Sequence, residues 1–136
     1  MSRDATLELF RAVRSALVAD ATLAAQVSTR VSTEWGNVLT PPFMRLSIAD
    51  VRRFEDDLGD GSEYTLRVHV FAKEAGPIIS AGLAAQVREV LQDADLGVAG
   101  ADLWWLTYDQ TVNIQDGDDP TLRMAVVAFK AVTTAS

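Results

Sequence analysis

Residues 64–73 read YTLRVHVFAK, the most regularly patterned stretch of the chain. One face of the strand that this run predicts carries Tyr64, Leu66, Val68, Val70 and Ala72. The opposite face carries Thr65, Arg67, His69, Phe71 and Lys73. Side chains that alternate between apolar and polar with a period of two are typical of a β-strand buried on one side. The run therefore predicts a sheet with one face covered by other elements.

Further strands are predicted on both sides of this run. Residues 44–48 alternate in the same way and form a half-buried strand before it. Residues 52–62, rich in acids and glycine, are expected to form a solvated connection between the two strands. Toward the C-terminus, residues 103–115 and 121–134 are two β-rich runs joined by the turn formers DGDDP. They predict one long hairpin.

Helices are predicted where apolar residues recur every three or four positions. The first covers residues 4–18, with Asp4 as its cap and a buried face of Leu7, Phe10, Val13 and Leu17. A short second helix is capped by Asp20 and buries Leu23 and Val27. The main helix starts at Gly76-Pro77, and its apolar stripe is Ile79, Leu83, Val87, Val90 and Leu91. Gly82 within it predicts close packing by the sheet or by a neighbouring subunit.

The order α-α-β-β-α-β-β predicts an α+β fold. We expect an antiparallel or mixed four-stranded sheet with helices packed on one face. Residues 30–42, punctuated by glycine and a proline pair, are expected to be irregular. With 136 residues and 49% hydrophobic side chains, the chain can bury one core, so residues 1–136 are predicted to be a single domain.

Composition excludes several classes of function. The chain has no cysteine, which rules out disulfides, thiolate metal sites and a cysteine nucleophile. Its formal charge of −7 opposes sequence-specific nucleic-acid binding, which depends on Lys and Arg neutralising phosphates. Charged residues near the N-terminus argue against a signal peptide, and no stretch suggests a membrane span. We expect synthesis in a cytoplasm and no membrane partner.

Residues that could carry chemistry favour ordinary structural roles instead. His69, the only histidine, has no orienting acid or second ligand in a recognisable pattern. The turn over residues 116–119 lacks the closing glutamate of a calcium loop and ends at Pro120. Asp56, Asp57 and Asp60 are surrounded by glycine and charge, where nothing would raise a carboxyl pKa for acid–base work. We expect no catalytic residues, no metal and no cofactor.

The last two strands are apolar on both faces. In the first of them, Trp104, Leu106 and Tyr108 are expected on one face, and Leu103, Trp105 and Thr107 on the other. Either these strands lie in the centre of one subunit, or a partner covers the second face. Aromatic side chains are enriched in the cores of interfaces, which favours assembly. The candidate subunit-interface residues are Phe71, Trp104, Trp105, Tyr108 and Phe129.

Five segments together resemble a known family. They are DATLAAQV at 20–27 with Arg30-Val31 after it, PPFMRL at 41–46, LRVHVF at 66–71, VREVL at 87–91 and VVAFKAV at 126–132. In this order and spacing they resemble the tail-completion, or tail-terminator, proteins of long-tailed phages and related gene transfer agents. The likeness covers nearly the whole chain, although Trp104-Trp105 is not a feature of the family.

The resemblance implies a structural protein of a phage-like particle, at the head-proximal end of the tail. Such proteins form a ring, typically a hexamer, that caps the tail tube, stops its growth and contacts the head connector, or stopper, protein. DNA passes through the bore without specific binding, and an acidic lumen would repel its phosphates. Candidate residues for the bore or the ring faces are Glu55, Asp56, Asp57, Asp60, Asp116, Asp118 and Asp119.

Two other functions stay open at this stage. Within the same class, the protein could be another neck or head-completion protein, which would bind the connector and not the tube. From a different class, it could be a small α+β enzyme or ligand-binding domain whose pocket uses Trp104, Trp105 and His69. Rings or binding to tube ends would support the tail-terminator function, whereas stabilisation by a ligand would support the enzyme or ligand-binding domain.

Overall fold

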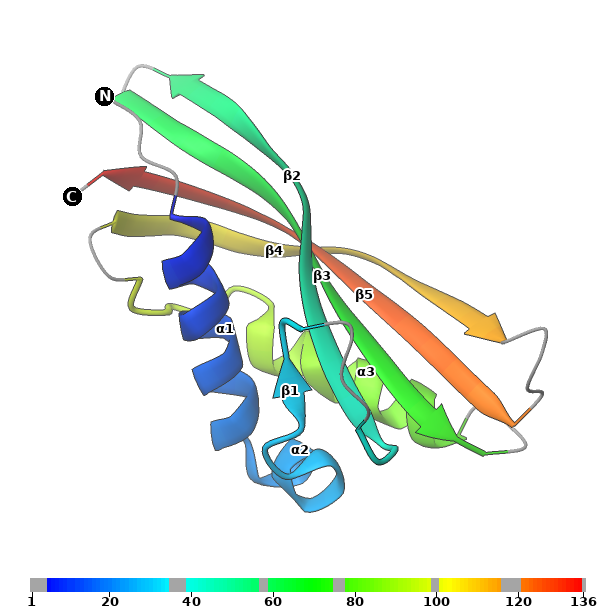
Figure 1. Cartoon of the computed structure of the whole chain (residues 1–136). Helices are drawn as coiled ribbons and strands as arrows, with labels where there is room; N and C mark the ends of the chain where they lie inside the picture. Colours follow the sequence, from blue (N-terminus) through cyan, green and yellow to red (C-terminus); the bar gives the residue numbers. More distant parts are fainter. Residues whose placement is uncertain are drawn as a thin grey trace.

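The protein is built on a strongly twisted sheet whose helices all lie on one side (Figure 1). The computed structural model describes residues 5–34, 39–56, 59–74, 78–98, 101–115 and 121–135, and at 54–56, 59, 60, 101, 115 and 135 the backbone alone. Across these residues the elements are α1 (Thr6–Ala19), α2 (Ala21–Val27), β1 (Val31–Ser32), β2 (Phe43–Asp56), β3 (Gly59–Lys73), α3 (Ile78–Leu91), β4 (Ala101–Gln115) and β5 (Leu122–Ala135).

The α+β class is confirmed, but the sheet has five strands in the order β1-β2-β3-β5-β4 and not the expected four. The additional strand, β1, lies in the segment predicted to be irregular. Val31 and Ser32 pair in parallel with Met44 and Arg45, and the Val31 carbonyl accepts a hydrogen bond from Arg14 Nε at 2.9 Å. Two residues are too few to show a period of two, so this strand leaves no pattern in the sequence.

The connection predicted over residues 52–62 is wrong, because most of it is strand. β2 continues to Asp56 and β3 begins at Gly59, with Arg52 opposite Glu63 and Glu55 opposite Asp60. Charged residues are compatible with an antiparallel ladder, because backbone hydrogen bonds hold it, and Arg52 faces the opposite charge of Glu63. The long C-terminal hairpin is confirmed: β4 and β5 are antiparallel along their lengths.

The first helix buries a different stripe from the predicted one. Val13 and Leu17 are buried as expected, but their partner is Leu9, while Leu7 is 56% exposed. The stripe through Leu7 and the stripe through Leu9 both fit a helical period. Packing against the other helices buries the stripe through Leu9, which is flanked by the small residues Ala12 and Ala16. Asp4 lies outside the described residues. The N-cap position is Ala5, whose N–H donates to the Tyr64 hydroxyl at 2.8 Å.

The other two helices begin at carboxylates. Asp20 accepts a hydrogen bond from the Leu23 N–H at 3.0 Å, which confirms the predicted cap of α2. At the start of α3, the carboxylate of Glu74 accepts from the N–H groups of Ile79 at 2.8 Å and Ser80 at 2.7 Å. The predicted start at Gly76-Pro77 lies outside the described residues.

The buried stripe of α3 only partly matches its prediction. Its core residues are Ser80, Leu83, Ala84, Val87 and Leu91, whereas Ile79 is 42% exposed and Val90 is half-buried. The predicted close packing of the sheet on Gly82 is wrong, since no described atom of the chain lies within 4 Å of the position a Cβ would take there.

The core fills the space between the helices and one face of the sheet, called here the inner face. Tyr64, Leu66, Val68 and Val70 of β3 point into it, as the sequence predicts, together with Phe129 of β5. The fully buried Tyr64 hydroxyl also contacts Thr133 Oγ1 at 3.1 Å, so the start of α1 is tied to two strands. No helix in the described part of the chain is long and apolar enough to cross a membrane.

Candidate assembly interface

The second face of the sheet, the outer face, carries no helix among the described elements (Figure 1). Its side chains can be followed in rows across four strands, because each strand pair is in antiparallel register. The first row, at the end where β2 begins, runs Phe43, Phe71, Met124 and Ile114. The rings of Phe43 and Phe71 stack with centroids 4.8 Å apart, and Ile114 is 42% exposed.

The second row joins apolar residues to a histidine and an arginine. It runs Arg45, His69, Val126 and Val112, and Val112 is 43% exposed. The guanidinium of Arg45 lies 5.0 Å from the Phe43 ring centroid, and its Nη1 donates to the backbone carbonyl of Glu34. Arg45 is therefore buried but remains hydrogen-bonded.

His69 is half-buried in this row. Its Nε2 lies 2.9 Å from the Ser47 hydroxyl. Burial lowers the pKa of His69, because it disfavours the charged imidazolium, and the nearby Arg67 charge lowers it further. The ring is thus held toward its neutral form, which is compatible with its apolar neighbours.

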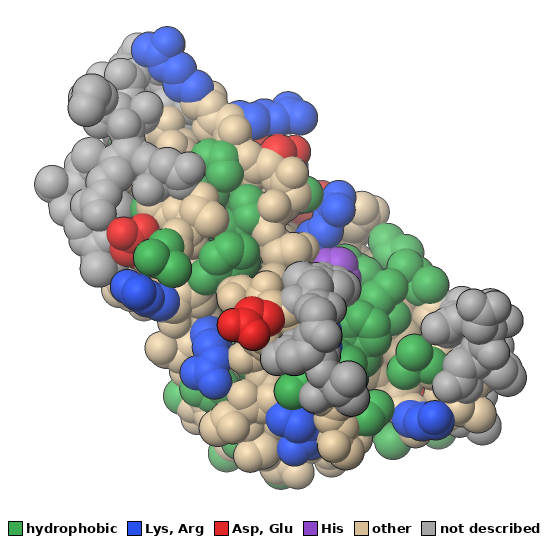
Figure 2. Space-filling model, viewed as in Figure 1, with side chains coloured by type: hydrophobic (Ala, Val, Ile, Leu, Met, Phe, Trp, Pro, Cys, Tyr) green, Lys and Arg blue, Asp and Glu red, His purple; other side chains and the backbone are tan. Residues whose placement is uncertain are grey.

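Six apolar side chains from the two rows lie next to one another on this face and are called here the outer patch: Phe43, Phe71, Val112, Ile114, Met124 and Val126. Val112 and Ile114 are the most exposed of them, whereas Phe43 is 8% exposed. Figure 2 shows hydrophobic side chains gathered beside the single histidine on this side of the molecule. An antiparallel sheet with helices on one face normally shows polar residues on the other. Connected apolar surface is typical of sites where another molecule binds, so the outer patch is the candidate interface.

Beyond the outer patch, the outer face becomes polar. The third row runs Ser47, Arg67, Ala128 and Gln110. In the fourth, Lys130 Nζ donates to Thr65 Oγ1 at 2.7 Å, and that hydroxyl donates to Asp50 Oδ1 at 3.0 Å. The apolar surface is therefore limited to one end of the sheet and to the region around Trp105 at the other.

The two tryptophans lie at a bulge in β4. The register shifts between Leu103 and Trp105, so Leu103 joins Leu106 on the inner side and the predicted alternation through Trp104 is wrong. Trp105 pairs with Val132 and is 39% exposed, and its ring centroid lies 6.2 Å from that of Trp104. Trp105 thus offers apolar surface at the open edge of the sheet.

The remaining interface candidates divide between the two faces. Phe71 belongs to the outer patch, but Phe129 is fully buried in the core of its own subunit, which removes it as a contact residue. Tyr108 points to the inner side, where its ring meets Phe129 edge-on at 5.9 Å. The sequence pattern of β5 showed two apolar faces but could not say which one the helices cover.

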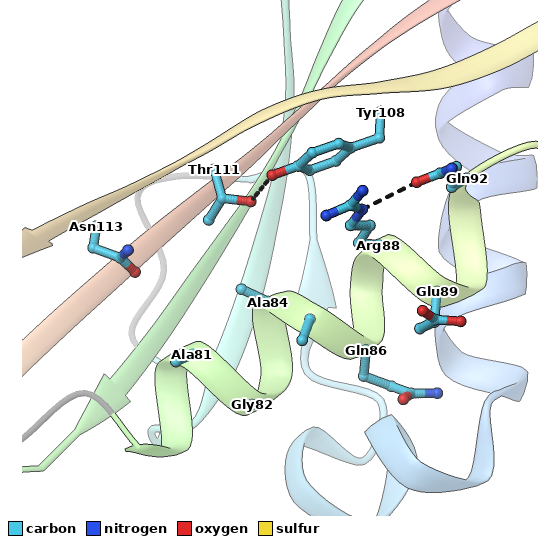
Figure 3. A pocket seen from close by; sticks show the side chains of 11 residues that line it. Ala81, Gly82, Ala84, Gln86, Arg88, Glu89, Gln92, Tyr108, Thr111 and Asn113 are labelled. Atoms are coloured by element: carbon cyan, nitrogen blue, oxygen red, sulfur yellow. Dashed lines mark hydrogen bonds between the residues drawn. The ribbon is translucent and has the colours of Figure 1, made fainter.

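Tyr108 also lines a groove of about 500 Å³ between α3 and β4 (Figure 3). The guanidinium of Arg88 lies 4.0 Å from the Tyr108 ring centroid, and the Tyr108 hydroxyl contacts Thr111 Oγ1 at 2.7 Å. Arg88 Nε donates to Gln92 Oε1 at 3.0 Å. Arg88, Gln92, Tyr108 and Thr111 of the groove are thus engaged with one another within the subunit.

The residues that an enzyme or ligand-binding domain would need do not come together. His69 pairs with Val126 and Trp105 with Val132, six residues farther along β5. At about 3.3 Å per residue this separates them by about 20 Å. Among the described residues there is no group of three His, Cys, Asp or Glu side chains that could hold a metal.

The acidic candidates are only partly described. Asp57, Asp116, Asp118 and Asp119 lie outside the described residues. The backbones of Glu55, Asp56 and Asp60 form the end of the β2–β3 hairpin. The last β3 residue that pairs with β5 at this end is Gly61, opposite Thr134, and the described backbones of Asp60 and Gly59 pair with β2 alone.

Comparison with known proteins agrees with this arrangement. A family model described as "Tail completion protein gp17" matches residues 11–134. A solved chain from the "Virion of native gene transfer agent (GTA) particle" is 27% identical, with a TM-score of 0.84 over 93% of this chain and 95% of that chain. Another solved chain, 13% identical with a TM-score of 0.61 over 96% of each chain, shares the fold. No curated protein matches the chain. The chain belongs to the tail completion protein gp17 family and is a structural protein of a phage-type tail.

Proposed function

We propose that the protein is a tail terminator: a ring, most simply a hexamer, that caps the tail tube and ends its growth. In this proposal one face of the ring binds the tail tube protein and the other binds the head connector, or stopper, protein. The outer patch is the observation that carries the proposal, because a structural tail protein whose sheet exposes apolar Val112 and Ile114 at one end has a surface suited to assembly.

Ring closure sets a requirement on the contacts. A ring forms when each copy uses two different surfaces, one toward each neighbour, and the rotation between copies closes. The outer patch supplies one such surface at the first two rows of the sheet. Trp105, toward the other end of the edge strand β4, supplies a second surface on the same face, away from the first.

The charge of the chain suits a bore for DNA. A formal charge of −7 per copy gives a ring of copies a strongly negative field, which repels phosphates and disfavours binding. The acidic turn over residues 116–119 and the acidic end of the β2–β3 hairpin are the candidate bore or ring-face segments.

Electron microscopy and native mass measurement, with and without isolated tail tubes, test the proposal. We expect the wild-type chain to form rings or to join tube ends. Val112→Lys and Ile114→Lys should prevent both without unfolding the subunit, because each adds a charge to a surface that must be dehydrated. Leu7→Lys is the matched control, since Leu7 is 56% exposed on the helix side.

Three outcomes separate the possibilities. Rings or capped tubes that disappear in the Val112 and Ile114 variants but persist in the Leu7 variant support the terminator. If the protein binds the connector but does not bind tubes, it is another neck protein and not the tail terminator. A wild-type chain that stays monomeric with tubes and with connector would contradict both.

A further inference from the structure

The sheet edge formed by β4 is covered by its own chain only in part. β4 pairs with β5 on one side and with no described strand on the other. Just after α3, the Asp93 N–H donates to the Leu106 carbonyl at 2.8 Å. That carbonyl therefore points away from β5, toward the open edge. Among the described residues, no backbone group beyond β5 pairs in this way with residues 108–114.

The hydrogen bond to Leu106 also shows which other backbone groups face the open edge. Successive residues of an antiparallel strand direct their N–H and C=O groups alternately toward the partner strand and away from it. Steps of two along β5 from the partner of Leu106 reach the partners of Tyr108, Thr111 and Asn113, with the bulged Asp109 left out. The N–H and C=O groups of these three residues therefore point to the open edge.

Residues 110–114 of this edge lack the features that keep sheet edges from pairing with other chains. Those features are charged side chains, proline, bulges and short strands. The sequence QTVNI at 110–114 has no charge and no proline, and the two bulges of β4 lie before it, at Trp104 and Asp109. An unprotected edge with unpaired backbone groups is suited to receive an extended segment as an added strand.

The groove between α3 and β4, called here the edge groove, lies directly beside this edge on the inner side. Its β4 wall is formed by Tyr108, Thr111 and Asn113, the residues whose backbone groups face the open edge (Figure 3). Its α3 wall includes three small, exposed residues: Ala81, Gly82 and Ala85. A strand added beside β4 would direct every second side chain into the edge groove, where the small residues leave room for it.

A second copy of the chain offers one other open edge, but that edge does not suit the edge groove. β1 pairs only with Met44 and Arg45, so no described strand lies beside β2 from Leu46 on. On the inner side of β2, Leu46 is 1% exposed and Ile48 packs against the core of its own copy. Side chains covered by their own helices cannot also enter a groove on a neighbour. The edge groove therefore suits an extended segment of another protein.

The surroundings set the composition of that segment. Its outer side chains would lie next to Val112 and Ile114, which are 43% and 42% exposed, and should be apolar. Its inner side chains would lie among the small residues of α3 and the polar Gln86 and Asn113, and should be short or polar. Because the chain belongs to a tail completion family, the tail is the source of the segment that the comparisons favour.

We infer that an extended segment of the tail tube protein adds to the sheet beside residues 110–114 of β4 and places alternate side chains in the edge groove. Backbone hydrogen bonds hold the segment, and the groove selects its inner side chains. This inference rests on the proposed function, in which the ring binds the tube, and it adds the surface and the mode of that binding.

A proline at the edge tests the backbone contact. Asn113→Pro removes an N–H that points to the open edge, at a kind of position where sheets tolerate proline. The variant should form rings as the wild type does but bind isolated tail tubes about tenfold more weakly or worse. Asn113→Ser keeps the N–H and is the matched control, which should bind tubes normally. Co-sedimentation with tubes measures binding, and urea unfolding checks the subunit.

A bulky residue on the opposite wall tests the groove. Ala85→Trp places a large side chain in the edge groove from an exposed position on α3, so it should also weaken tube binding about tenfold or more and leave rings intact. Ala25→Trp, at an exposed position of α2, is the matched control and should have no effect.

Hydrogen exchange at single residues locates the added strand. In the isolated ring the amides of Thr111 and Asn113 should exchange rapidly, because they point to the open edge. With tail tubes bound, both should exchange slowly. The Val112 amide, which points to β5, should be protected in both states.

The outcomes separate this inference from the proposed function. If Asn113→Pro or Ala85→Trp binds tubes like the wild type, the strand addition is wrong, while the terminator stands. Loss of rings in these variants would make the edge a contact between copies, and loss of connector binding alone would make the connector the occupant; either result would overturn the inference. A wild type that binds no tubes would overturn the terminator as well.

Discussion

His69 lies where the apolar and the charged parts of the outer face meet, and its environment is set by particular neighbours. The Ser47 hydroxyl contacts Nε2, Val126 pairs with it across β5, and Arg45 pairs with it across β2. Burial and the Arg67 charge both lower its pKa below the usual 6.5. The histidine thus acts as a neutral polar residue within a sheet face and has no catalytic partner among these neighbours.

This shift predicts how stability changes with pH. Below pH 6.5 the unfolded chain takes up a proton at His69 more readily than the folded chain, so the free energy of unfolding should fall as the pH drops from 7.5 to 5.5. His69→Gln cannot take up this proton and should show a smaller fall. Urea unfolding of both proteins at the two pH values is the measurement. Equal falls would mean that His69 is not held neutral by the fold.

At the scale of elements, patterns with a regular period were predictable and irregular ones were not. The alternation in residues 64–73 identified β3 and its inner face, and Asp20 identified the start of α2. The bulges in β4 shift the side-chain alternation at Trp104 and Asp109, and a one-residue shift leaves no trace in composition. For α1, two stripes shared Val13 and Leu17, and only tertiary packing could choose between them.

The candidate site, like the elements, could be predicted only in part from the sequence, as the outer patch shows. Phe71 was found by its residue type, but Val112, Ile114 and Phe43 were missed, because their shared surface depends on register across four strands. Phe129 was a candidate by type as well, and the position of the helices places it in the core. The residue types in the sequence show an excess of apolar side chains, but the strand order and register decide which of these side chains share a surface.

Two glycines in different elements should respond oppositely to alanine. At Gly61 of β3, an added Cβ would lie 2.4 Å from the Thr133 carbonyl oxygen, so Gly61→Ala should destabilise the subunit by about 1–3 kcal/mol. At Gly82 of α3 the space is open, and Gly82→Ala should stabilise it by about 0.4–1 kcal/mol. Denaturant unfolding of the monomeric subunit measures both changes.

The Gly82 variant also reports on assembly. If a neighbouring copy packs closely against α3, Gly82→Ala should weaken ring formation even though it stabilises the subunit. A Gly61→Ala subunit as stable as the wild type would mean that β3 and β5 are not as close at this point as the structure has them.

At the scale of the whole molecule, charge and apolar surface are unevenly distributed. The chain is acidic overall, yet the outer patch gathers apolar side chains at one end of its outer sheet face. In the proposed ring, the apolar end of this face contacts a neighbouring copy, and the net negative charge of the chain opposes the binding of DNA. This division of surfaces links the fold to a structural role in a tail.

The acidic surface predicts an effect on DNA passage. Asp118→Lys with Asp119→Lys should slow DNA release from assembled particles, because positive charges in a bore would hold the phosphates. Glu89→Lys with Asp95→Lys changes the net charge equally on exposed residues of the helix side and is the control. Unaltered release in the first variant would place the 116–119 turn away from the path of DNA.

The most direct test of the central claim is a structure of the assembled particle end, or of the isolated ring, by electron cryomicroscopy. We expect Val112, Ile114 and Met124 of every copy to be covered by a neighbouring copy. A ring whose copies join through their helices, with the outer patch facing solvent, would contradict it.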